Sequence, residues 1–252
     1  MIKISIITAT FNSQNTIIDC INSVSKQDYK NIEHILVDGN SSDNTRKLLL
    51  ERIENIDFLI SEPDLGIYDA FNKGLKLATG DIVGFLNSDD CYASDNVLNI
   101  IASEFESDPN LCALYGDLVY VKYDNINTIA RYWKSSDYPG TLKYGWMPPH
   151  PTLYVRHCFY NKIDGFDSNF KISADYLSIL KLFKIQNFKS KYIPKVMVKM
   201  RLGGVSNRSF SSILNKTLED FLVLKKFNSS LFRILIILFF KNIKIFRQLI
   251  IK

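Results

Sequence analysis

The first half of the chain alternates between short apolar runs and segments whose apolar residues recur at three- and four-residue steps. The apolar runs predict strands at residues 3–8, 33–38, 57–60 and 82–86. The periodic segments predict helices at residues 14–26, 43–54 and 67–79. Alternation of strands and helices with short links is typical of a mostly parallel sheet with helices on both faces. The fold class predicted from this pattern is therefore α/β.

The pattern changes from about residue 112. Residues 112–124 and 128–133 alternate apolar and polar positions and are rich in aromatics, which predicts longer, more antiparallel strands. The remaining predictions are an ordered loop at 138–151, a helix at 174–187, a strand at 191–200 and a helix near 209–227. Since no linker separates the halves, we expect one domain at 1–205 and a C-terminal helical appendage at 206–252.

Composition and charge narrow the class of protein. The 252 residues are 46% hydrophobic, which excludes general disorder. The net charge of +5 is uneven, because the last 32 residues carry seven basic and no acidic side chains, against 24 basic and 26 acidic elsewhere. The body is therefore not that of a general nucleic-acid binder. Four cysteines without C-x-x-C or metal-ligand spacing favour reduced thiols in a cytosolic protein.

Polar clusters follow the four predicted strands of the first half, at residues 8–12, 38–45, 61–74 and 87–90. In a parallel α/β sheet, ligands bind outside the carboxyl ends of the strands. Each cluster alone is an ordinary loop sequence. Four clusters at successive strand ends predict a single binding crevice.

Asp38 and Phe11 are candidates for binding a ligand in this crevice. Asp38 closes an apolar strand, so its carboxylate either accepts from a ligand N–H, such as a nucleobase imide, or caps the helix beginning near Ser42. Phe11 either offers a stacking face or belongs to the core.

Asp89 and Asp90 are adjacent carboxylates after the fourth strand. Two such charges ionise together only beside a compensating cation, and Mg²⁺ and Mn²⁺ prefer oxygen ligands. The alternative is a turn exposed to water. The chain has neither G-x-x-x-x-G-K-[ST] nor G-x-G-x-x-G, so a bound phosphate would rely on the metal and on cations such as Lys73 or Arg201.

Asp175 and His150 complete the set of candidates in the second half. Asp175 begins a predicted helix, where it serves either as a carboxylate base or as an N-terminal charge on the helix. His150, in MPPHP, is either a polar site residue or a structural histidine.

Taken together, these segments resemble family 2 glycosyltransferases with the GT-A fold. The resemblance covers roughly residues 2–176 in the family's order, through SIITATFN, ILVDGNSSDNT, SEPDLGIYDAFNKGLKLATGD, FLNSDD and GFDSNFKISADY. It implies a Rossmann-like nucleotide-sugar half at 1–111 and an acceptor half at 112–205.

The resemblance also implies roles for individual residues. Asp175 matches the catalytic base of inverting members, and Asp89 matches the metal ligand of the D-x-D motif. Asp90 is its neighbour and does not bind the metal directly. His150 and Arg201 are candidates for acceptor or diphosphate binding. Asn87 stands where many relatives have an aspartate, so the site has one negative charge fewer. The residues that match the donor site are Thr8, Ala9, Phe11, Asn12, Asp38, Asp64, Lys73, Asn87 and Ser88.

The implied activity is metal-dependent, inverting sugar transfer with Mn²⁺ or Mg²⁺. The donor would be a nucleotide-diphosphate sugar, UDP favoured, and the enzyme a hexosyl- or N-acetylhexosaminyltransferase. The acceptor would be a lipid-linked saccharide of a bacterial O-antigen, capsule or colanic-acid pathway. The alternatives are a nucleotidyltransferase acting on sugar phosphates and a catalytically silent binding module.

The tail, residues 229–252, predicts a basic amphipathic helix. Its longest uncharged run is seven residues, too short to span a bilayer. Its polar residues fall within roughly a 140° arc of a helix; they are Arg233, Lys241, Lys244, Arg247, Gln248 and Lys252. We expect this helix to lie on an anionic membrane, which places the protein on the cytosolic face of the inner membrane. The alternative is a core helix or a helix that forms a homo-oligomer.

Overall fold

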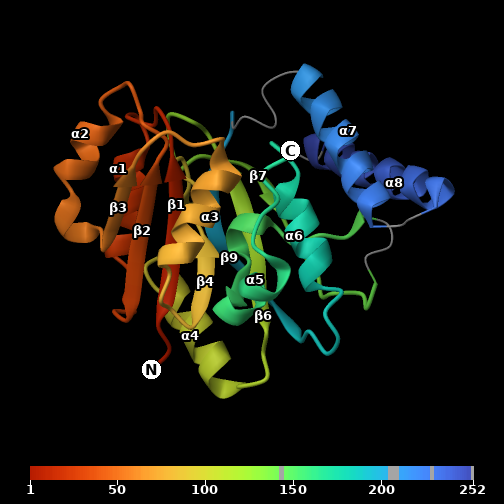
Figure 1. Ribbon diagram of the computed structural model, residues 1–252, viewed down its shortest axis with the longest axis horizontal. Helices are drawn as coiled ribbons and strands as arrows, with labels where there is room; N and C mark the ends of the chain where they lie inside the picture. The colour runs from red at the N-terminus through yellow and green to blue at the C-terminus, as the bar shows by residue number, and fades with distance from the viewer. Residues whose placement is uncertain (142–144, 204–209, 228–229, 251–252) are drawn as a thin grey trace.

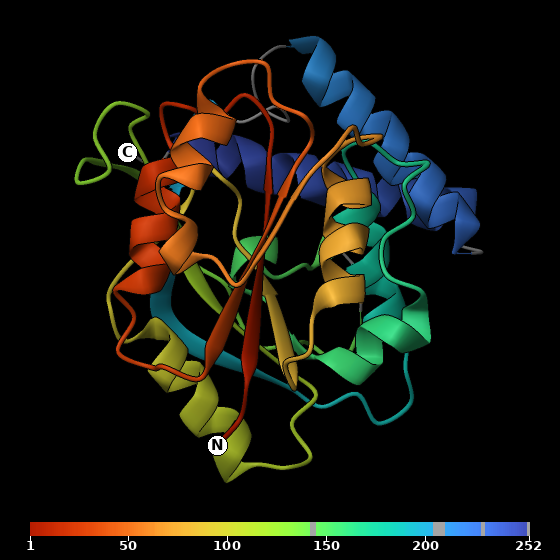
Figure 2. The ribbon, with the colours of Figure 1, turned by 60° about the vertical axis from the view of Figure 1, so that its left-hand side comes forward.

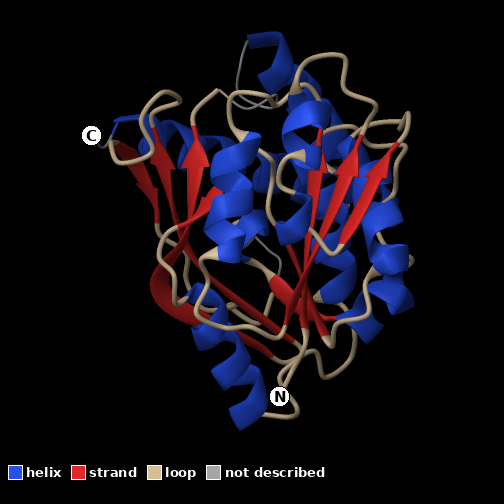
Figure 3. Ribbon diagram, turned by 90° about the vertical axis from the view of Figure 1, so that its left-hand side faces the viewer, coloured by secondary structure: helices blue, strands red, loops and turns tan. Residues whose placement is uncertain are grey.

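A mixed β-sheet forms the centre of the molecule (Figures 1 and 3). The computed structural model describes residues 1–141, 145–203, 210–227 and 230–250. The sheet order is β3-β2-β1-β4-β8-β6-β9-β5, and β7 pairs with β6. The strands are β1 (Ile4–Thr10), β2 (Ile32–Asp38), β3 (Phe58–Ser61), β4 (Ile82–Phe85), β5 (Cys91–Tyr92), β6 (Ala113–Val121), β7 (Ile129–Trp133), β8 (Tyr154–Arg156) and β9 (Ser190–Arg201). The α-helices are α1 (Ile17–Ser25), α2 (Thr45–Leu50), α3 (Ile67–Leu77), α4 (Val97–Ser107), α5 (His157–Ile163), α6 (Ala174–Leu182), α7 (Phe210–Lys226) and α8 (Leu231–Ile250), with 3₁₀ turns at η1 (Ile53–Asn55) and η3 (His150–Thr152).

The first four strands form the parallel half that the hydrophobic pattern predicts. β1 pairs in parallel with both β2 and β4, and β2 pairs in parallel with β3. Because these strands run the same way, their carboxyl ends meet at one edge of the sheet. The polar clusters at residues 8–12, 38–45, 61–74 and 87–90 therefore lie along that edge.

The second half of the sheet is more mixed than expected. β6 pairs antiparallel with β7 and β8 but parallel with β9, and β8 joins the halves by pairing antiparallel with β4. The expected parallel pairing is found in β1–β4, the expected antiparallel pairing is found between β6 and its neighbours β7 and β8, and the parallel pairing of β6 with β9 is the addition. β8 has three residues and β5 has two, too few for an alternation of apolar and polar residues to be recognised.

Helices cover both faces of the sheet, and a separate apolar cluster fills each interface (Figure 2). α3, α5 and α6 pack on one face, and α1 and α4 on the other. α3 comes close to β1 because Gly74 has no side chain: a Cβ there would stand 2.4 Å from Cγ2 of Ile7. This close packing holds the first turn of α3 beside the carboxyl ends of the strands.

The C-terminal helices α7 and α8 pack beside α6 (Figure 1). Their shared apolar cluster contains Tyr176, Leu177, Leu180, Val223, Leu224, Ile234 and Ile237. The boundary predicted at residue 205 falls among residues 204–209, outside the described part of the chain. No helix within the described residues is both long enough and apolar enough to cross a membrane.

Candidate active site

Hydrogen bonds join the loops that follow β1, β2 and β4. The amide oxygen of Asn12 accepts from the Ser42 backbone N–H at 2.9 Å, and the Asn12 backbone N–H donates to the Ser41 hydroxyl at 2.8 Å. The hydroxyls of Ser13 and Ser88 lie 2.8 Å apart. Three of the predicted clusters therefore form one connected surface, built mostly of short polar side chains.

Asp38 joins the loop after β2 to the end of β3. Its buried carboxylate accepts from the Ser41 backbone N–H at 3.1 Å and from the Ser61 hydroxyl at 2.7 Å. The residue before α2 is Asn44, so Asp38 does not occupy the helix-capping position. An ionised carboxylate offers about four acceptor positions, which leaves room for a further donor.

The residues after β1 divide between the interior and the surface. Phe11 is 61% exposed, so it is not a core residue. Thr8 is buried, and its hydroxyl lies 3.0 Å from Nε2 of His34. Ala9 is buried as well. Only Phe11 and Asn12 present side chains outside the sheet.

Asp64 brings the loop after β3 against the loop after β2. One of its oxygens lies 2.6 Å from where a Cβ on Gly39 would stand, so a larger residue at position 39 would displace the Asp64 carboxylate. Its other oxygen accepts from the Gly66 N–H at 2.9 Å.

Lys73 is engaged in ion pairs. Its ammonium lies 2.8 Å from Glu62 and 3.6 Å from Asp69, and it donates to the Pro63 carbonyl at 2.9 Å. The hydrogen bond to Glu62 is the main cause that raises the pKa of Lys73. In this state Lys73 stabilises the loop that contains Asp64.

The two adjacent aspartates occupy different environments. Asp90 is fully buried, where it accepts from the Asn87 side-chain amide at 2.9 Å and from the Arg201 backbone N–H at 3.3 Å. Burial, and then the charge of Asp89, raise the pKa of Asp90 well above its ordinary value. Asp89 is half-buried. The loop therefore holds Asp90 inward and Asp89 nearer the surface.

Arg201 stabilises the loop that contains Asp89 and Asp90. Its guanidinium is buried, donates to the carbonyl of Asp89 at 2.8 Å and to that of Tyr123 at 3.1 Å, and forms an ion pair with Asp19. These bonds fix the backbone at Asp89.

Asp175 lies at the start of α6 against the first turn of α3. Its Oδ1 accepts from the Tyr68 hydroxyl at 3.2 Å and from the Tyr176 backbone N–H at 2.7 Å. Burial and the nearby Asp175 charge raise the pKa of Tyr68 well above its ordinary value. Tyr68 was not predicted as a site residue. It lies on the buried side of α3 with Ala70 and Phe71, and its signal in the sequence is an aromatic ring with a hydroxyl in the first turn of that helix.

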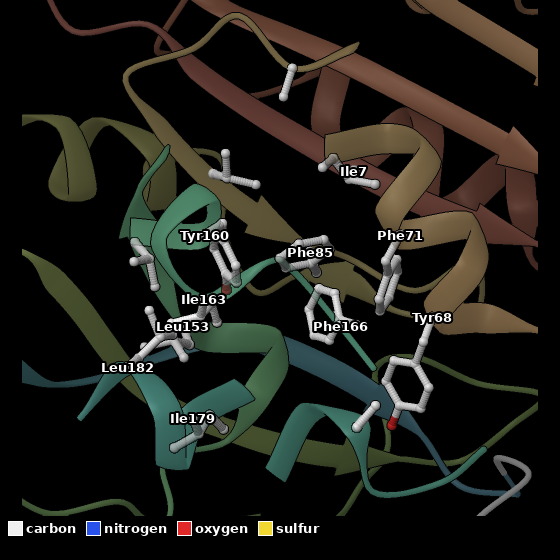
Figure 4. Packing of buried hydrophobic residues seen from close by; sticks show 14 of the residues in the cluster. Ile7, Tyr68, Phe71, Phe85, Leu153, Tyr160, Ile163, Phe166, Ile179 and Leu182 are labelled. Atoms are coloured by element: carbon white, nitrogen blue, oxygen red, sulfur yellow. The ribbon is translucent and has the colours of Figure 1, made fainter. Parts of the chain in front are cut away.

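His150 lies in a cluster of aromatic rings (Figure 4 shows the neighbouring side chains). Its ring centroid is 5.4 Å from that of Phe85 and 5.7 Å from that of Phe166, and Phe166 stacks on Tyr68 at 5.6 Å. Burial lowers the pKa of His150, and the charge of Asp175 opposes that effect. In the described part of the chain, its Nε2 has no hydrogen-bond partner.

No group of three or more His, Cys, Asp or Glu side chains among the described residues is placed to hold a metal ion. Mg²⁺ in nucleotide enzymes is commonly held by one or two carboxylates together with substrate phosphates. Asp89 fits this arrangement as the single half-buried carboxylate on the loop after β4.

Comparisons with known proteins agree with this architecture. Residues 5–170 match the model of the family described as "Glycosyl transferase family 2". The PGL/p-HBAD biosynthesis glycosyltransferase of Mycobacterium bovis is 26% identical over 208 residues, covering 81% of this chain and 78% of that protein. The Escherichia coli UDP-Glc:alpha-D-GlcNAc-diphosphoundecaprenol beta-1,3-glucosyltransferase WfgD is 35% identical over 124 residues, covering 49% of this chain and 48% of that protein.

Among solved structures, S. aureus TarS 1-349 in complex with UDP-GlcNAc superposes with a TM-score of 0.70 at 21% identity, covering 91% of this chain and 68% of that chain. At this identity the likeness is one of fold. The chain spans about half the length of WfgD and about two thirds of this TarS chain.

Proposed function

The chain belongs to glycosyl transferase family 2, and from this premise we propose that it moves a sugar from a UDP-sugar to a hydroxyl of a lipid-linked saccharide. Membership of this family makes the protein a glycosyltransferase. The names of two similar proteins support the finer statement: TarS is described with UDP-GlcNAc, and WfgD is named for UDP-Glc and a diphosphoundecaprenol-linked acceptor.

The observation that carries the proposal is the contact between Asp175 and α3, the helix that follows the third of the strand-end loops. Tyr68 bonds Asp175 from the first turn of α3, the helix that directly follows the loop containing Asp64. A ligand on the strand-end loops would therefore lie close to a carboxylate held by a tyrosine. We assign residues 1–111 to the donor and 112–205 to the acceptor.

We assign Asp175 as the general base of the transfer. It takes the proton of the acceptor hydroxyl, whose oxygen forms the bond to the anomeric carbon as the bond from that carbon to the diphosphate breaks. UDP leaves with the electron pair of that bond, and the configuration at the anomeric carbon inverts. Tyr68 orients the carboxylate through its hydrogen bond.

For the donor, we assign Phe11 and Asp38 to the nucleoside and the loop at Asp64 to the ribose and diphosphate. Asp89 would hold Mg²⁺ or Mn²⁺, which when bound supplies positive charge to stabilise the leaving diphosphate. Asn87 already donates to Asp90, so we expect its role to be support of the loop. Lys73 and Arg201 act in the same supporting way through their protein partners.

The proposal is tested by hydrolysis of UDP-Glc and UDP-GlcNAc in the presence of Mn²⁺ or Mg²⁺. We expect Asp175→Asn to lower the rate of UDP release by about 10²- to 10⁴-fold, the range typical of a lost general base. Asp89→Asn or chelation of the metal should also lower it strongly. The matched control is Asp108→Asn, which removes a surface carboxylate paired with Lys189 and should leave the rate of UDP release unchanged.

Hydrolysis that survives both Asp89→Asn and Asp175→Asn would contradict the proposal. Release of pyrophosphate from a nucleoside triphosphate and a sugar phosphate would instead identify a nucleotidyltransferase. Binding of UDP without turnover of any UDP-sugar would indicate a binding module.

We further propose that α8 docks the enzyme on the cytosolic face of an anionic membrane, where a lipid-linked acceptor would be found. The polar arc predicted for this helix needs one correction. Lys241 points inward, with its side chain only 12% exposed and its ammonium 2.7 Å from Asp220. Arg233 is exposed as predicted, whereas the side chains of Lys244, Arg247, Gln248 and Lys252 fall outside the described part of the chain.

The apolar residues support a sharper assignment of the docking surface. Phe232 is 75% and Phe239 is 63% exposed, and Leu235 lies between them. α7 adds a stripe of exposed leucines at four-residue steps: Leu214, Leu218 and Leu222. We name the exposed side chains of Phe232, Leu235 and Phe239 the docking face.

A further inference from the structure

The three residues that precede α6 are held by a carboxylate from a different helix. Glu219 of α7 accepts through Oε1 from the Lys171 backbone N–H at 3.1 Å. Its Oε2 accepts from the Ile172 N–H at 2.8 Å and the Ser173 N–H at 2.9 Å. Bonds from N–H groups to an ionised carboxylate are shorter and stronger than neutral ones. One side chain therefore fixes three successive peptide groups.

The same segment is held from its other side by α3. The Tyr68 hydroxyl lies 2.7 Å from the Ile172 carbonyl and 3.2 Å from Asp175 Oδ1. Ile172 is thus bonded through its N–H to α7 and through its carbonyl to α3. Asp175 follows this segment by two residues, so its position depends on both bonds.

α7 is in turn fixed against α6 and α8. Asp220, the neighbour of Glu219, pairs with Lys241 of α8, and the two side chains are only 6% and 12% exposed. The Lys241 ammonium also lies 3.4 Å from the centroid of the Tyr176 ring, next in sequence to Asp175. Burial lowers the pKa of Lys241, and Asp220 opposes that effect. Lys241 of α8 therefore contacts both α7, through Asp220, and α6, through Tyr176.

We propose that Glu219 is a positioning residue for Asp175, and that the helix pair α7–α8 is therefore part of the active site as well as an appendage. This inference rests on the proposed role of Asp175 as the base. Glu219 touches no reacting atom and acts through the backbone of residues 171–173.

The test is a double-mutant cycle between Glu219 and Asp175. The readout is hydrolysis of UDP-GlcNAc or UDP-Glc, whichever is faster, divided by the number of UDP-binding sites found by calorimetry. We expect Glu219→Ala to lower this rate about tenfold, because small displacements of a catalytic group are costly. In the Asp175→Asn background the same change should lower it less than twofold. Glu219→Gln, which retains one carbonyl acceptor, should give an intermediate rate.

Equal losses in both backgrounds would overturn the inference, because a residue with a merely structural role acts whether or not the base is present. If Asp175→Asn itself has no effect, the proposed function fails instead, so the two failures are distinguishable.

Amide hydrogen exchange supplies a second measurement that does not depend on turnover. Glu219→Ala should accelerate exchange at residues 171–173 and in the first turn of α6. The matched control is Lys226→Ala, which removes another link between α7 and the same loop, the ion pair with Asp167 at 2.6 Å. It should leave both the exchange of 171–173 and the hydrolysis rate unchanged. Unchanged exchange in Glu219→Ala would also overturn the inference.

Discussion

His34 lies on β2 inside the sheet, where its Nε2 contacts the Thr8 hydroxyl of β1. Burial lowers its pKa from 6.5 to about 4. The unfolded chain therefore binds a proton at this residue below about pH 6.5, while the native chain does so only near pH 4. Stability should fall as the pH drops through this interval, by up to about 3 kcal/mol from His34 alone.

Urea unfolding between pH 7 and pH 5 measures this effect. His34→Gln, which keeps a polar group near Thr8, should show a weaker dependence of the unfolding free energy on pH, by about one proton. The control His157→Gln, on a half-exposed residue, should keep the full dependence. An identical pH dependence in His34→Gln and the native chain would contradict the prediction.

Individual residues also show how far sequence reasoning about the site extends. Asp38, Asp89 and Asp175 were predicted from their places at the ends of strands or the start of a helix, and in the structure they lie at the end of β2, after β4 and in the first turn of α6. The partners of Lys73 and Arg201 could not be predicted. Those partners are Glu62 for Lys73 and Asp19 for Arg201, and the packing of the fold, not the local sequence pattern, brings each pair together.

At the scale of elements, most long periodic segments were predicted, with the eleven-residue helix α4 as the exception, and the shortest elements were not predicted. The predicted helix at 67–79 corresponds to α3, and the strand at 191–200 to β9. α4 and α5 were missed, as were β5 and β8. α5 has only seven residues, and β5 and β8 owe their pairing to partners distant in sequence. Such elements are defined by tertiary contacts.

The pair formed by Lys241 and Asp220 links α8 to α7, and it yields a prediction at this scale. Lys241→Met should destabilise the protein by about 3 kcal/mol, because it leaves Asp220 buried without its cation. Adding Asp220→Asn should restore much of that loss, since the unpaired charge is then removed. Urea unfolding of both single variants and the double variant measures the coupling. Additive losses in the double variant would show that the pair is not energetically coupled.

For the molecule as a whole, the body contains the proposed base and donor site, and the C-terminal helices contain both Glu219 and the docking face. Phe232 and Phe239 are exposed, whereas Ile234 and Ile237 of the same helix are buried against α6 and α7. Deleting α8 would therefore remove core residues as well as the docking face. Substitution of exposed residues is the cleaner test of membrane binding.

We expect Phe232→Ser with Phe239→Ser to weaken binding to vesicles of phosphatidylglycerol and phosphatidylcholine by about a hundredfold or more, because each of the two inserted rings contributes about 1.5–3 kcal/mol. Thermal stability should not fall, since neither ring is part of the core. The control Leu50→Ser removes a side chain that is 57% exposed on α2 and should leave vesicle binding unchanged. Sedimentation of lipid-free protein separates the remaining alternative. If the double substitution leaves vesicle binding intact but converts an oligomer to monomers, the docking face is a subunit interface and the membrane assignment is wrong.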